Sequence, residues 1–293
     1  MGSSSKMKTN LLIVFLGILF ASLIFGGYKY YVLSQEYEAN KLTNEGVITE
    51  LRATLDTVQL EKTSLSDALT AEQNKNEEFE EQIEDLFGTV GALTKLSKTD
   101  PELLKKYSKV YFLNENYVPP KLSDISSDAL FDTSKPQKFL TEALPFLKRL
   151  LADAKRDGID LKIISAYRSF DTQATLKSNY KFIYGAGTAN QFSADQGYSE
   201  HQLGTAIDFT NSTVGGALNS FENTPEHTWL VENAYKFGFI LSYPSGNQYY
   251  QYEPWHWRFV GIDLAGKLHD QNKKFYDLDQ NQIDSFLIKI FDR

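Results

Sequence analysis

Two segments in the second half of the chain combine a histidine with nearby carboxylates. The first reads SEHQLGTAID over residues 199–208, and the second reads EPWHWR over residues 253–258. Together they contain two of the four histidines of the protein. Two imidazoles and one carboxylate are enough to hold Zn²⁺ with a fourth position open for water. A carboxylate that is left over can act as a base on that water, so the pattern predicts both a metal and a reaction, zinc-assisted hydrolysis.

The spacing within the first segment indicates how it presents its side chains. His201 and Asp208 are seven residues apart, which does not fit one face of a single strand. The spacing suits a histidine in a loop or at a helix end, a turn at Gly204, and then a carboxylate on the strand that follows. We therefore expect a turn to bring the two side chains together.

A third segment extends the pattern towards the N-terminus, because residues 165–169 read SAYRS and are followed by Gln173. The three segments, in this order, resemble the VanY-type D-alanyl-D-alanine carboxypeptidases, which belong to a wider group of zinc peptidases that includes LD-carboxypeptidases and some phage endolysins. The resemblance covers roughly residues 123–265. It implies that the zinc ligands are His201, Asp208 and His256.

The resemblance also implies a proton carrier, Glu253, three residues before His256. In this role Glu253 takes a proton from the zinc-bound water. Pro254 helps to hold its orientation, because proline fixes φ and lacks a backbone donor. Glu200 is the competing carboxylate because it adjoins a ligand, and we interpret it as a support of the site or a surface residue.

Five further side chains are candidates for handling the substrate. The resemblance implies that Arg168 either stabilises the developing oxyanion or binds the terminal carboxylate of the substrate. A fixed guanidinium suits both roles. A surface salt bridge is the alternative for this arginine. Ser199 and Gln173 match positions that hydrogen-bond the substrate. Tyr167 and Trp255 are expected to form walls of the pocket, with core packing as their alternative.

The composition excludes several kinds of site and partner. The 293 residues include no cysteine, which excludes thiolate zinc sites, cysteine nucleophiles and disulfides. The net charge of −8 and the pI of about 5.2 argue against a nucleic-acid partner. Residues 34–96 carry 14 acidic and 5 basic side chains, so the negative charge is concentrated there.

The N-terminal region predicts a membrane anchor. Residues 11–27 form an uninterrupted run of apolar or small residues, preceded by lysines and followed by Lys29 and three tyrosines. We interpret residues 11–33 as an uncleaved transmembrane signal anchor and residues 1–10 as a cytoplasmic tail, with a cleaved signal peptide as the alternative. The rest of the chain is then extracytoplasmic, on a single-pass protein of the bacterial cell membrane.

The acidic region after the anchor, residues 34–96, predicts a coiled-coil stalk. Heptad positions a and d over residues 48–93 are apolar in eleven cases out of fourteen. This spacing favours self-association as a coiled coil, and Asn76 at an a position is a device that selects a dimer. The alternative is a single amphipathic helix that folds back on another element.

The remaining chain predicts an α+β domain over residues 123–293, preceded by a linker over residues 97–122 that Pro119 and Pro120 end. We expect a mostly antiparallel sheet flanked by helices. The expected helices include Gln137–Arg156 and Asp171–Lys181. The expected strands are residues 161–164, 204–209 and 249–260.

These features predict a membrane-anchored zinc carboxypeptidase that removes the terminal D-alanine from peptidoglycan stem peptides. An LD-carboxypeptidase acting on tetrapeptide stems is a close alternative, because the same segments serve both activities. An endopeptidase needs a groove that is open at both ends. A non-catalytic scaffold that only binds cell-wall peptide is the alternative from another class, and the retained base and ligands argue against it.

Overall fold

The computed structural model describes residues 3–107, 113–184 and 194–292. The chain divides into two compact units, Met1–Leu86 and Phe87–Arg293. The second unit contains all of the candidate site residues. Each unit is described below by itself.

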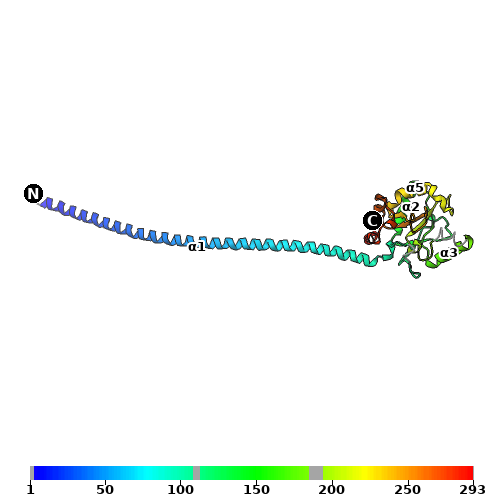
Figure 1. The fold of residues 1–293 in the computed structure, drawn as a ribbon. Helices are drawn as coiled ribbons and strands as arrows, with labels where there is room; N and C mark the ends of the chain where they lie inside the picture. Colours follow the sequence, from blue (N-terminus) through cyan, green and yellow to red (C-terminus); the bar gives the residue numbers. More distant parts are fainter. Residues whose placement is uncertain (1–2, 108–112, 185–193, 293) are drawn as a thin grey trace. The chain divides into compact units, whose positions relative to one another are not determined.

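One helix, α1 (Ser3–Lys98), contains the predicted anchor and the predicted stalk (Figure 1). Within the described residues, it is the one helix with a stretch that is long and apolar enough to cross a membrane. The helix continues without a break through residues 48–93, where the heptad leucines and valines are exposed on its surface. The helical stalk is therefore present, and its self-association stays a prediction.

The second unit is built on a four-stranded antiparallel sheet with the strand order β3-β4-β6-β5. Its strands are β3 (Lys162–Ser165), β4 (Ala206–Thr210), β6 (His256–Phe259) and β5 (Phe239–Leu241). A second, two-stranded antiparallel sheet pairs β1 (Leu122–Asp124) with β2 (Lys138–Leu140). The expected antiparallel sheet of an α+β domain is thereby confirmed.

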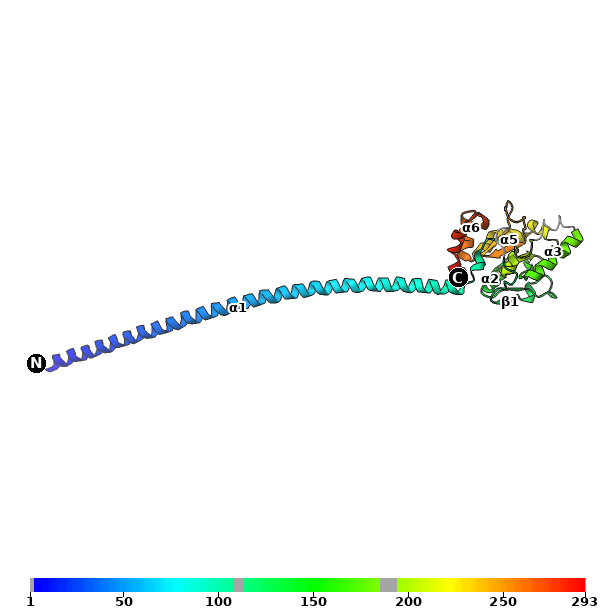
Figure 2. The same ribbon diagram turned by 60° about the horizontal axis from the view of Figure 1, so that its bottom comes forward.

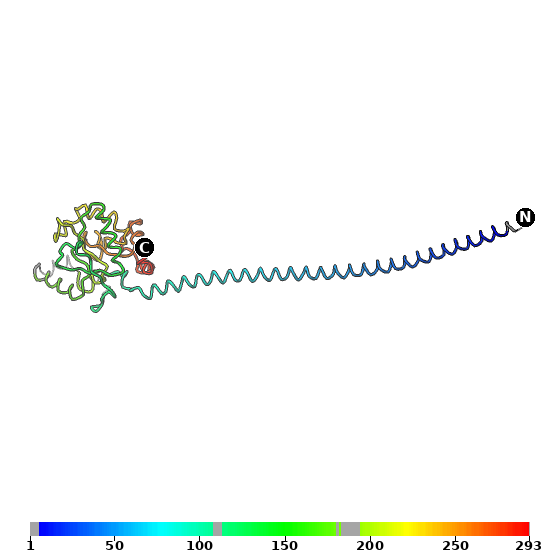
Figure 3. The backbone as a smooth tube through the Cα atoms, turned by 180° about the vertical axis from the view of Figure 1, so that it is seen from behind, coloured from blue at the N-terminus to red at the C-terminus, as the bar shows by residue number. Residues whose placement is uncertain are grey.

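Helices surround the sheet in the second unit (Figure 2). The α-helices are α2 (Leu144–Arg156), α3 (Phe170–Tyr184), α5 (Pro225–Asn233), α6 (Ile262–Asp270) and α7 (Gln280–Asp284). Short 3-10 helices are η1 (Pro101–Leu104), η2 (Ser127–Ala129), η3 (Glu200–Leu203), η4 (Leu218–Asn223), η5 (Ala234–Phe237), η6 (Phe275–Asp277) and η7 (Leu287–Lys289). The C-terminal residues lie beside the last turns of α1 (Figure 3), where Lys95 Nζ and Asp292 Oδ1 are 2.7 Å apart.

Strands β4 and β6 each alternate between a core face and a polar face, as residues of a strand do. On the core face, Ile207 and Phe209 of β4 lie in the same buried cluster as Trp257 and Phe259 of β6. The aromatic rings of Phe146 in α2 and Phe259 are 4.8 Å apart, so α2 packs against this face. The polar face of the two strands is left to carry the site.

Two expected elements differ from the sequence interpretation. The helix expected over Gln137–Arg156 begins at Leu144, because residues 138–140 pair as strand β2. Pro145 lies in the first turn of α2, where a missing N–H costs nothing, and therefore does not kink the helix. The strand expected over residues 249–260 is confined to His256–Phe259, after a looped approach that includes Pro254.

The region expected to be a linker, residues 97–122, contributes to the folded unit. Leu103 and Leu104 of η1 are buried in the main core, and Tyr107 and Leu113 pack with Leu203. Strand β1 also begins at Leu122. The folded unit therefore starts before Ser123, because apolar side chains in this region find partners that are distant in sequence.

Candidate metal centre and active site

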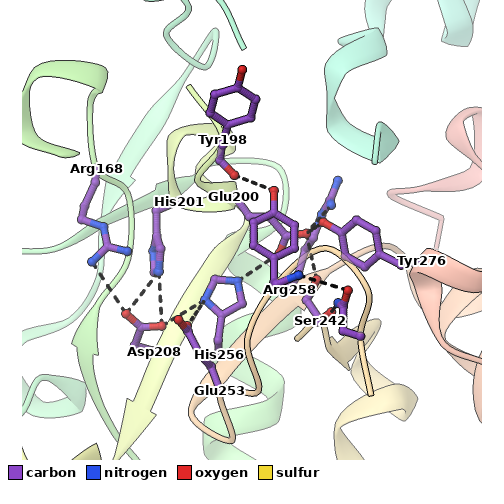
Figure 4. Close-up of polar contacts among 12 residues, drawn as sticks. Arg168, Tyr198, Glu200, His201, Asp208, Ser242, Glu253, His256, Arg258 and Tyr276 are labelled. Atoms are coloured by element: carbon purple, nitrogen blue, oxygen red, sulfur yellow. Dashed lines mark hydrogen bonds and ion pairs between the residues drawn. The ribbon is translucent and has the colours of Figure 1, made fainter. Parts of the chain in front are cut away.

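The three candidate ligands converge on one point although they come from three elements (Figure 4). His201 lies in η3, Asp208 in β4 and His256 in β6, and all three side chains are buried. One ligand atom from each lies within 4.8 Å of the others. His201 Nε2 is 3.1 Å from Asp208 Oδ2, and His256 Nδ1 is 3.1 Å from Asp208 Oδ1.

Strand register explains why two of these ligands meet. Asp208 and His256 are direct partners in the antiparallel pair of β4 and β6. Directly opposed residues project their side chains from the same face of a sheet. Both residues belong to the polar face, so the alternation that buries Ile207 and Trp257 in the core also aims the two ligands at each other.

The third ligand is placed by the turn at Gly204, as the spacing predicts. Gly204 ends η3 in the left-handed conformation, with a φ of 71°. A side chain there would be strained, and its Cβ would lie 3.1 Å from Leu122 Cδ2 and 3.2 Å from Pro119 Cγ. The glycine lets the chain reverse from His201 into β4.

Each histidine is oriented by a hydrogen bond from the nitrogen that faces away from the ligand cluster. His201 Nδ1 donates to the Ala166 carbonyl at 2.6 Å, which leaves Nε2 facing Asp208. His256 Nε2 donates to Glu200 Oε2 at 3.0 Å, which leaves Nδ1 facing Asp208. Such outer hydrogen bonds fix the tautomer and the ring orientation of metal-binding histidines.

The protonation states of His201 and Asp208 favour a cation between them. Burial and the nearby Arg168 lower the pKa of His201 to about 4. Burial alone would raise the pKa of Asp208, but the hydrogen bond from His256 and the positive charge of Arg168 hold it well below its usual range. A neutral Nε2 lone pair then faces an ionised carboxylate at 3.1–3.2 Å, with no proton to bridge them. This donor set fits Zn²⁺.

His256 differs from His201 in its charge. Burial opposes its protonation, but the hydrogen bonds that His256 donates to Asp208 and Glu200 outweigh burial and raise the pKa of His256 to about 9. In the metal-free chain this imidazole therefore carries a second proton near neutral pH. A metal must displace that proton from Nδ1, as is usual when histidine becomes a ligand.

The candidate base lies next to this cluster without belonging to it. Glu253 Oε2 is 3.9 Å from His256 Nδ1, and its side chain is 17% exposed. Its backbone N–H donates to the Tyr243 carbonyl, and its own carbonyl accepts from the N–H of His256. Burial raises the pKa of Glu253 to about 7, against the opposing charge of His256. The position and the pKa suit a group that exchanges a proton near neutral pH.

The ligands and Glu253 open into a cavity of about 570 Å³. Four other predicted site residues line this cavity: Arg168, Gln173, Ser199 and Trp255. Tyr167 is not among the described residues that line it, and its N–H instead donates to the Lys138 carbonyl. The structure therefore does not give Tyr167 the expected place in the pocket wall.

Arg168 reaches the cluster from the loop after β3. Its Nη1 is 3.9 Å from Asp208 Oδ2, a distance too long for a direct hydrogen bond. Its Nε is buried and has no hydrogen-bond partner within the described part of the chain. The guanidinium therefore keeps donor capacity at the cavity.

Tyr243 and residues 216–220 lie at the site although the sequence interpretation did not identify them. The ring of Tyr243 stacks on His256, with centroids 4.0 Å apart, and lines the cavity. Residues 216–220 form another part of the cavity lining. Glu200 takes the first of its two expected places, as a buried support that contacts His256, and Arg258 is buried beside it. Arg258 was visible as the arginine of the EPWHWR segment, two residues after a ligand and therefore on the same strand face.

Comparison with known proteins agrees with this site. The family model of the VanY D-alanyl-D-alanine carboxypeptidases matches residues 137–262. The chain is also 30% identical over 236 residues to YodJ of Bacillus subtilis (strain 168), which is named a carboxypeptidase. That match covers 79% of this chain and 86% of YodJ. The chain belongs to the VanY family of D-alanyl-D-alanine carboxypeptidases.

Solved structures from the same group resemble this VanY-family domain. The LdcB LD-carboxypeptidase is 34% identical, with a TM-score of 0.55 over 60% of this chain and 85% of that structure. A mutant of the VanY D,D-pentapeptidase, in complex with Zn(II), is 26% identical, with a TM-score of 0.50 over 60% of this chain and 97% of that structure. The VanY-family domain thus has neighbours of both the D,D and the LD type.

Proposed function

We propose that this protein is a zinc-dependent D-alanyl-D-alanine carboxypeptidase that removes the terminal D-alanine from peptidoglycan stem peptides. The observation that carries the proposal is the convergence of His201, Asp208 and His256 on one point, with Glu253 beside them at a cavity. Family membership supports it, as does the Zn(II) complex of the VanY neighbour.

The proposed reaction divides the work between the metal and the protein. Zinc held by His201, Asp208 and His256 supplies Lewis-acid chemistry that polarises the scissile carbonyl and activates water. Glu253 takes the proton from the attacking water at a carboxylate oxygen. It then gives this proton to the nitrogen of the leaving D-alanine, as a raised pKa allows.

Arg168 is the group proposed to bind the substrate. Its partly unpaired guanidinium at the cavity suits the terminal carboxylate, which a planar fork binds in bidentate contact. The same group suits the negative charge that develops on the carbonyl oxygen. Ser199 and Gln173 line the same cavity and are proposed to hydrogen-bond the peptide.

LD-carboxypeptidase activity on tetrapeptide stems is the second candidate. It is favoured by one observation, the 34% identity to the LdcB LD-carboxypeptidase. In both candidates the leaving group is a D-alanine with a free carboxylate, so the proposed roles of Glu253 and Arg168 are the same.

The apolar stretch of α1 is proposed to anchor the protein in the bacterial cell membrane. Lysines before residue 11 favour a cytoplasmic N-terminus, which places the catalytic unit on the outer side, where peptidoglycan lies. The location supports the proposed substrate.

A panel of substrates tests the proposal. Pentapeptide stems, tetrapeptide stems and crosslinked muropeptides are digested side by side, with and without a chelator, and both the released D-alanine and the remaining peptides are measured. We expect release from the pentapeptide, loss of activity with chelator, and recovery on adding Zn²⁺. Cleavage of the tetrapeptide alone would assign the LD activity. Cleavage of the crosslinked muropeptides alone would contradict a carboxypeptidase.

Amidating the terminal D-alanine tests the role of Arg168, because the amide removes the charge and keeps the scissile bond. We expect wild type to lose most activity on the amide and Arg168→Ala to be poor on both substrates, with little further loss on the amide. Arg156→Ala, which changes an exposed arginine on α2, is the matched control. Equal wild-type cleavage of acid and amide would favour an endopeptidase.

A further inference from the structure

Glu200 lies under the metal cluster and is surrounded by hydrogen-bond donors. Its Oε2 accepts from His256 Nε2 at 3.0 Å. Its Oε1 accepts from Arg258 Nη1 at 2.7 Å, from Ser242 Oγ at 2.8 Å and from the Tyr276 hydroxyl at 2.6 Å (Figure 4). The carboxylate is fully buried. One oxygen therefore serves the histidine, and the other is held by three donors.

Arg258 connects this carboxylate to the region that follows α1. Its Nη2 donates to the Leu103 carbonyl at 2.8 Å and to the Lys105 carbonyl at 3.0 Å. The guanidinium also lies over the ring of Phe275, with its carbon 4.7 Å from the ring centroid. Arg258 is fully buried, so its two nitrogens link two distant parts of the chain without help from solvent.

The backbone that receives Arg258 is itself fixed to the folded unit. The side chains of Leu103 and Leu104 are buried in the core. Gln280 of α7 accepts from the Lys106 N–H at 3.1 Å and donates to the Leu104 carbonyl at 3.3 Å. The carbonyls of residues 103–105 are thus rigid acceptors at a set distance from Glu200.

A buried ion pair of this kind needs a reason other than stability. Removing two charges from water is costly, and apolar residues of similar volume often serve stability as well or better. The pair instead fixes which ring nitrogen of His256 carries the proton. An ionised Oε2 can only accept, so His256 must keep its proton on Nε2, and Nδ1 is left to face His201 and Asp208.

We infer that Glu200, Arg258 and Tyr276 are positioning residues for the metal ligand His256, and that residues 103–105 complete this support through Arg258. The inference rests on the proposed zinc function, because it assigns His256 Nδ1 to the metal. It adds to that function a chain of contacts that runs from the segment after the anchoring helix to the ligand.

Glu200→Gln is the most direct test of whether Glu200 sets the tautomer of His256. An amide in place of the carboxylate turns one acceptor into a donor. If the three donors hold the amide oxygen, the NH₂ group faces His256 Nε2 and moves the imidazole proton to Nδ1. We expect the affinity of the metal-free full-length protein for added Zn²⁺, measured in detergent against a chromophoric chelator, to fall by about 10- to 100-fold.

Tyr276→Phe is the milder variant, because it removes one hydroxyl and keeps the buried ring. We expect its zinc affinity to lie between those of wild type and Glu200→Gln. Tyr252→Phe is the matched control, since it removes a hydroxyl that donates to the carboxylate of Glu222 outside the cavity lining. Its zinc affinity should equal that of wild type.

Arg258→Lys tests the link to residues 103–105. A lysine keeps the charge but has no fork with which to bind Glu200 and two backbone carbonyls together. We expect a loss of zinc affinity larger than that of Tyr276→Phe. Should Arg258→Lys not fold, the comparison of Tyr276→Phe with Tyr252→Phe still decides the inference.

The unfolding temperature of each metal-free variant separates positioning from a purely structural role. Lowered zinc affinity in folded Glu200→Gln and Tyr276→Phe supports the inference. Variants that unfold at lower temperature yet bind Zn²⁺ as wild type does would overturn it. Failure of the proposed function looks different, because then wild type itself would bind no zinc or release no D-alanine.

Discussion

At the scale of single residues, Glu253 is the side chain on which the proposed chemistry depends most. It stands 3.9 Å from His256 and donates no ligand atom to the cluster of His201, Asp208 and His256. We expect Glu253→Gln to keep its zinc and to lose about 10²- to 10⁴-fold in kcat, the usual contribution of a general acid–base group. Metal analysis and D-alanine release on the same sample check both parts. A variant without zinc would make Glu253 a ligand, and full activity would show that another group carries the proton.

The pKa of the same residue predicts a pH dependence. Burial raises the pKa of Glu253 to about 7, so the carboxyl is protonated below that pH and cannot accept a proton. We expect kcat/KM at saturating zinc to rise with pH on the acid side, and the positive charge of bound zinc to move this rise below pH 7. The residual activity of Glu253→Gln should lack the rise. If that variant keeps it, another group is responsible.

At the scale of elements, the turn at Gly204 sets the position of η3 relative to β4. A side chain in the left-handed region costs about 1–2 kcal/mol, and the contacts to Leu122 and Pro119 add to this cost. We expect Gly204→Ala to lower the free energy of unfolding of the metal-free protein by at least that amount and to weaken zinc binding. Denaturant unfolding and chelator competition measure the two effects.

A control for that variant is available within the same unit. Gly266 lies inside α6, and a Cβ added there meets no atom within 4 Å. Gly266→Ala should therefore leave zinc affinity unchanged and stabilise the fold by about 0.5–1 kcal/mol, the usual gain in a helix interior. Equal behaviour of the two variants would show that Gly204 has no special part in placing His201.

The parts of the fold that depend on local sequence pattern could be predicted from the sequence. The turn at Gly204, and the strand after it that carries Asp208, follow from residues within a few positions of each other. The pairing of Asp208 with His256 does not, because register between strands 48 residues apart is set by tertiary packing. Tyr276 could not be identified for the same reason, since its hydrogen bond to Glu200 spans 76 residues of sequence.

The N-terminal boundary of the folded unit could not be predicted from local sequence pattern either. Pro119 and Pro120 made residues 97–122 resemble a linker that ends before the folded unit. What decides their structure is the burial of Leu103 and Leu104 in a core formed by residues far along the chain. Such burial leaves no periodic signal in a segment as short as η1.

At the scale of the whole molecule, the exposed heptad of α1 predicts a dimer. We expect residues 34–293 to be dimeric and residues 99–293 to be monomeric by light scattering at micromolar concentration, because apolar a and d positions associate. Replacing Leu55 and Leu69 with glutamate should give a monomer. Replacing Thr57 and Thr63, which lie outside the a and d positions, should not. Equal monomer masses throughout would leave the stalk as a spacer.

The carbonyls of residues 103–105 that hold Arg258 have a consequence for how this enzyme can be recombined with other proteins. A gene fusion that joined a new leader at the first strand, near Leu122, would transplant the three proposed ligands and the proposed base. It would also discard the acceptors of a fully buried guanidinium. The graft would carry an unpaired charge beneath its proposed metal site. The smallest exchangeable module of this protein therefore includes the chain from about Asp100 onward, rather than only the part from the first strand.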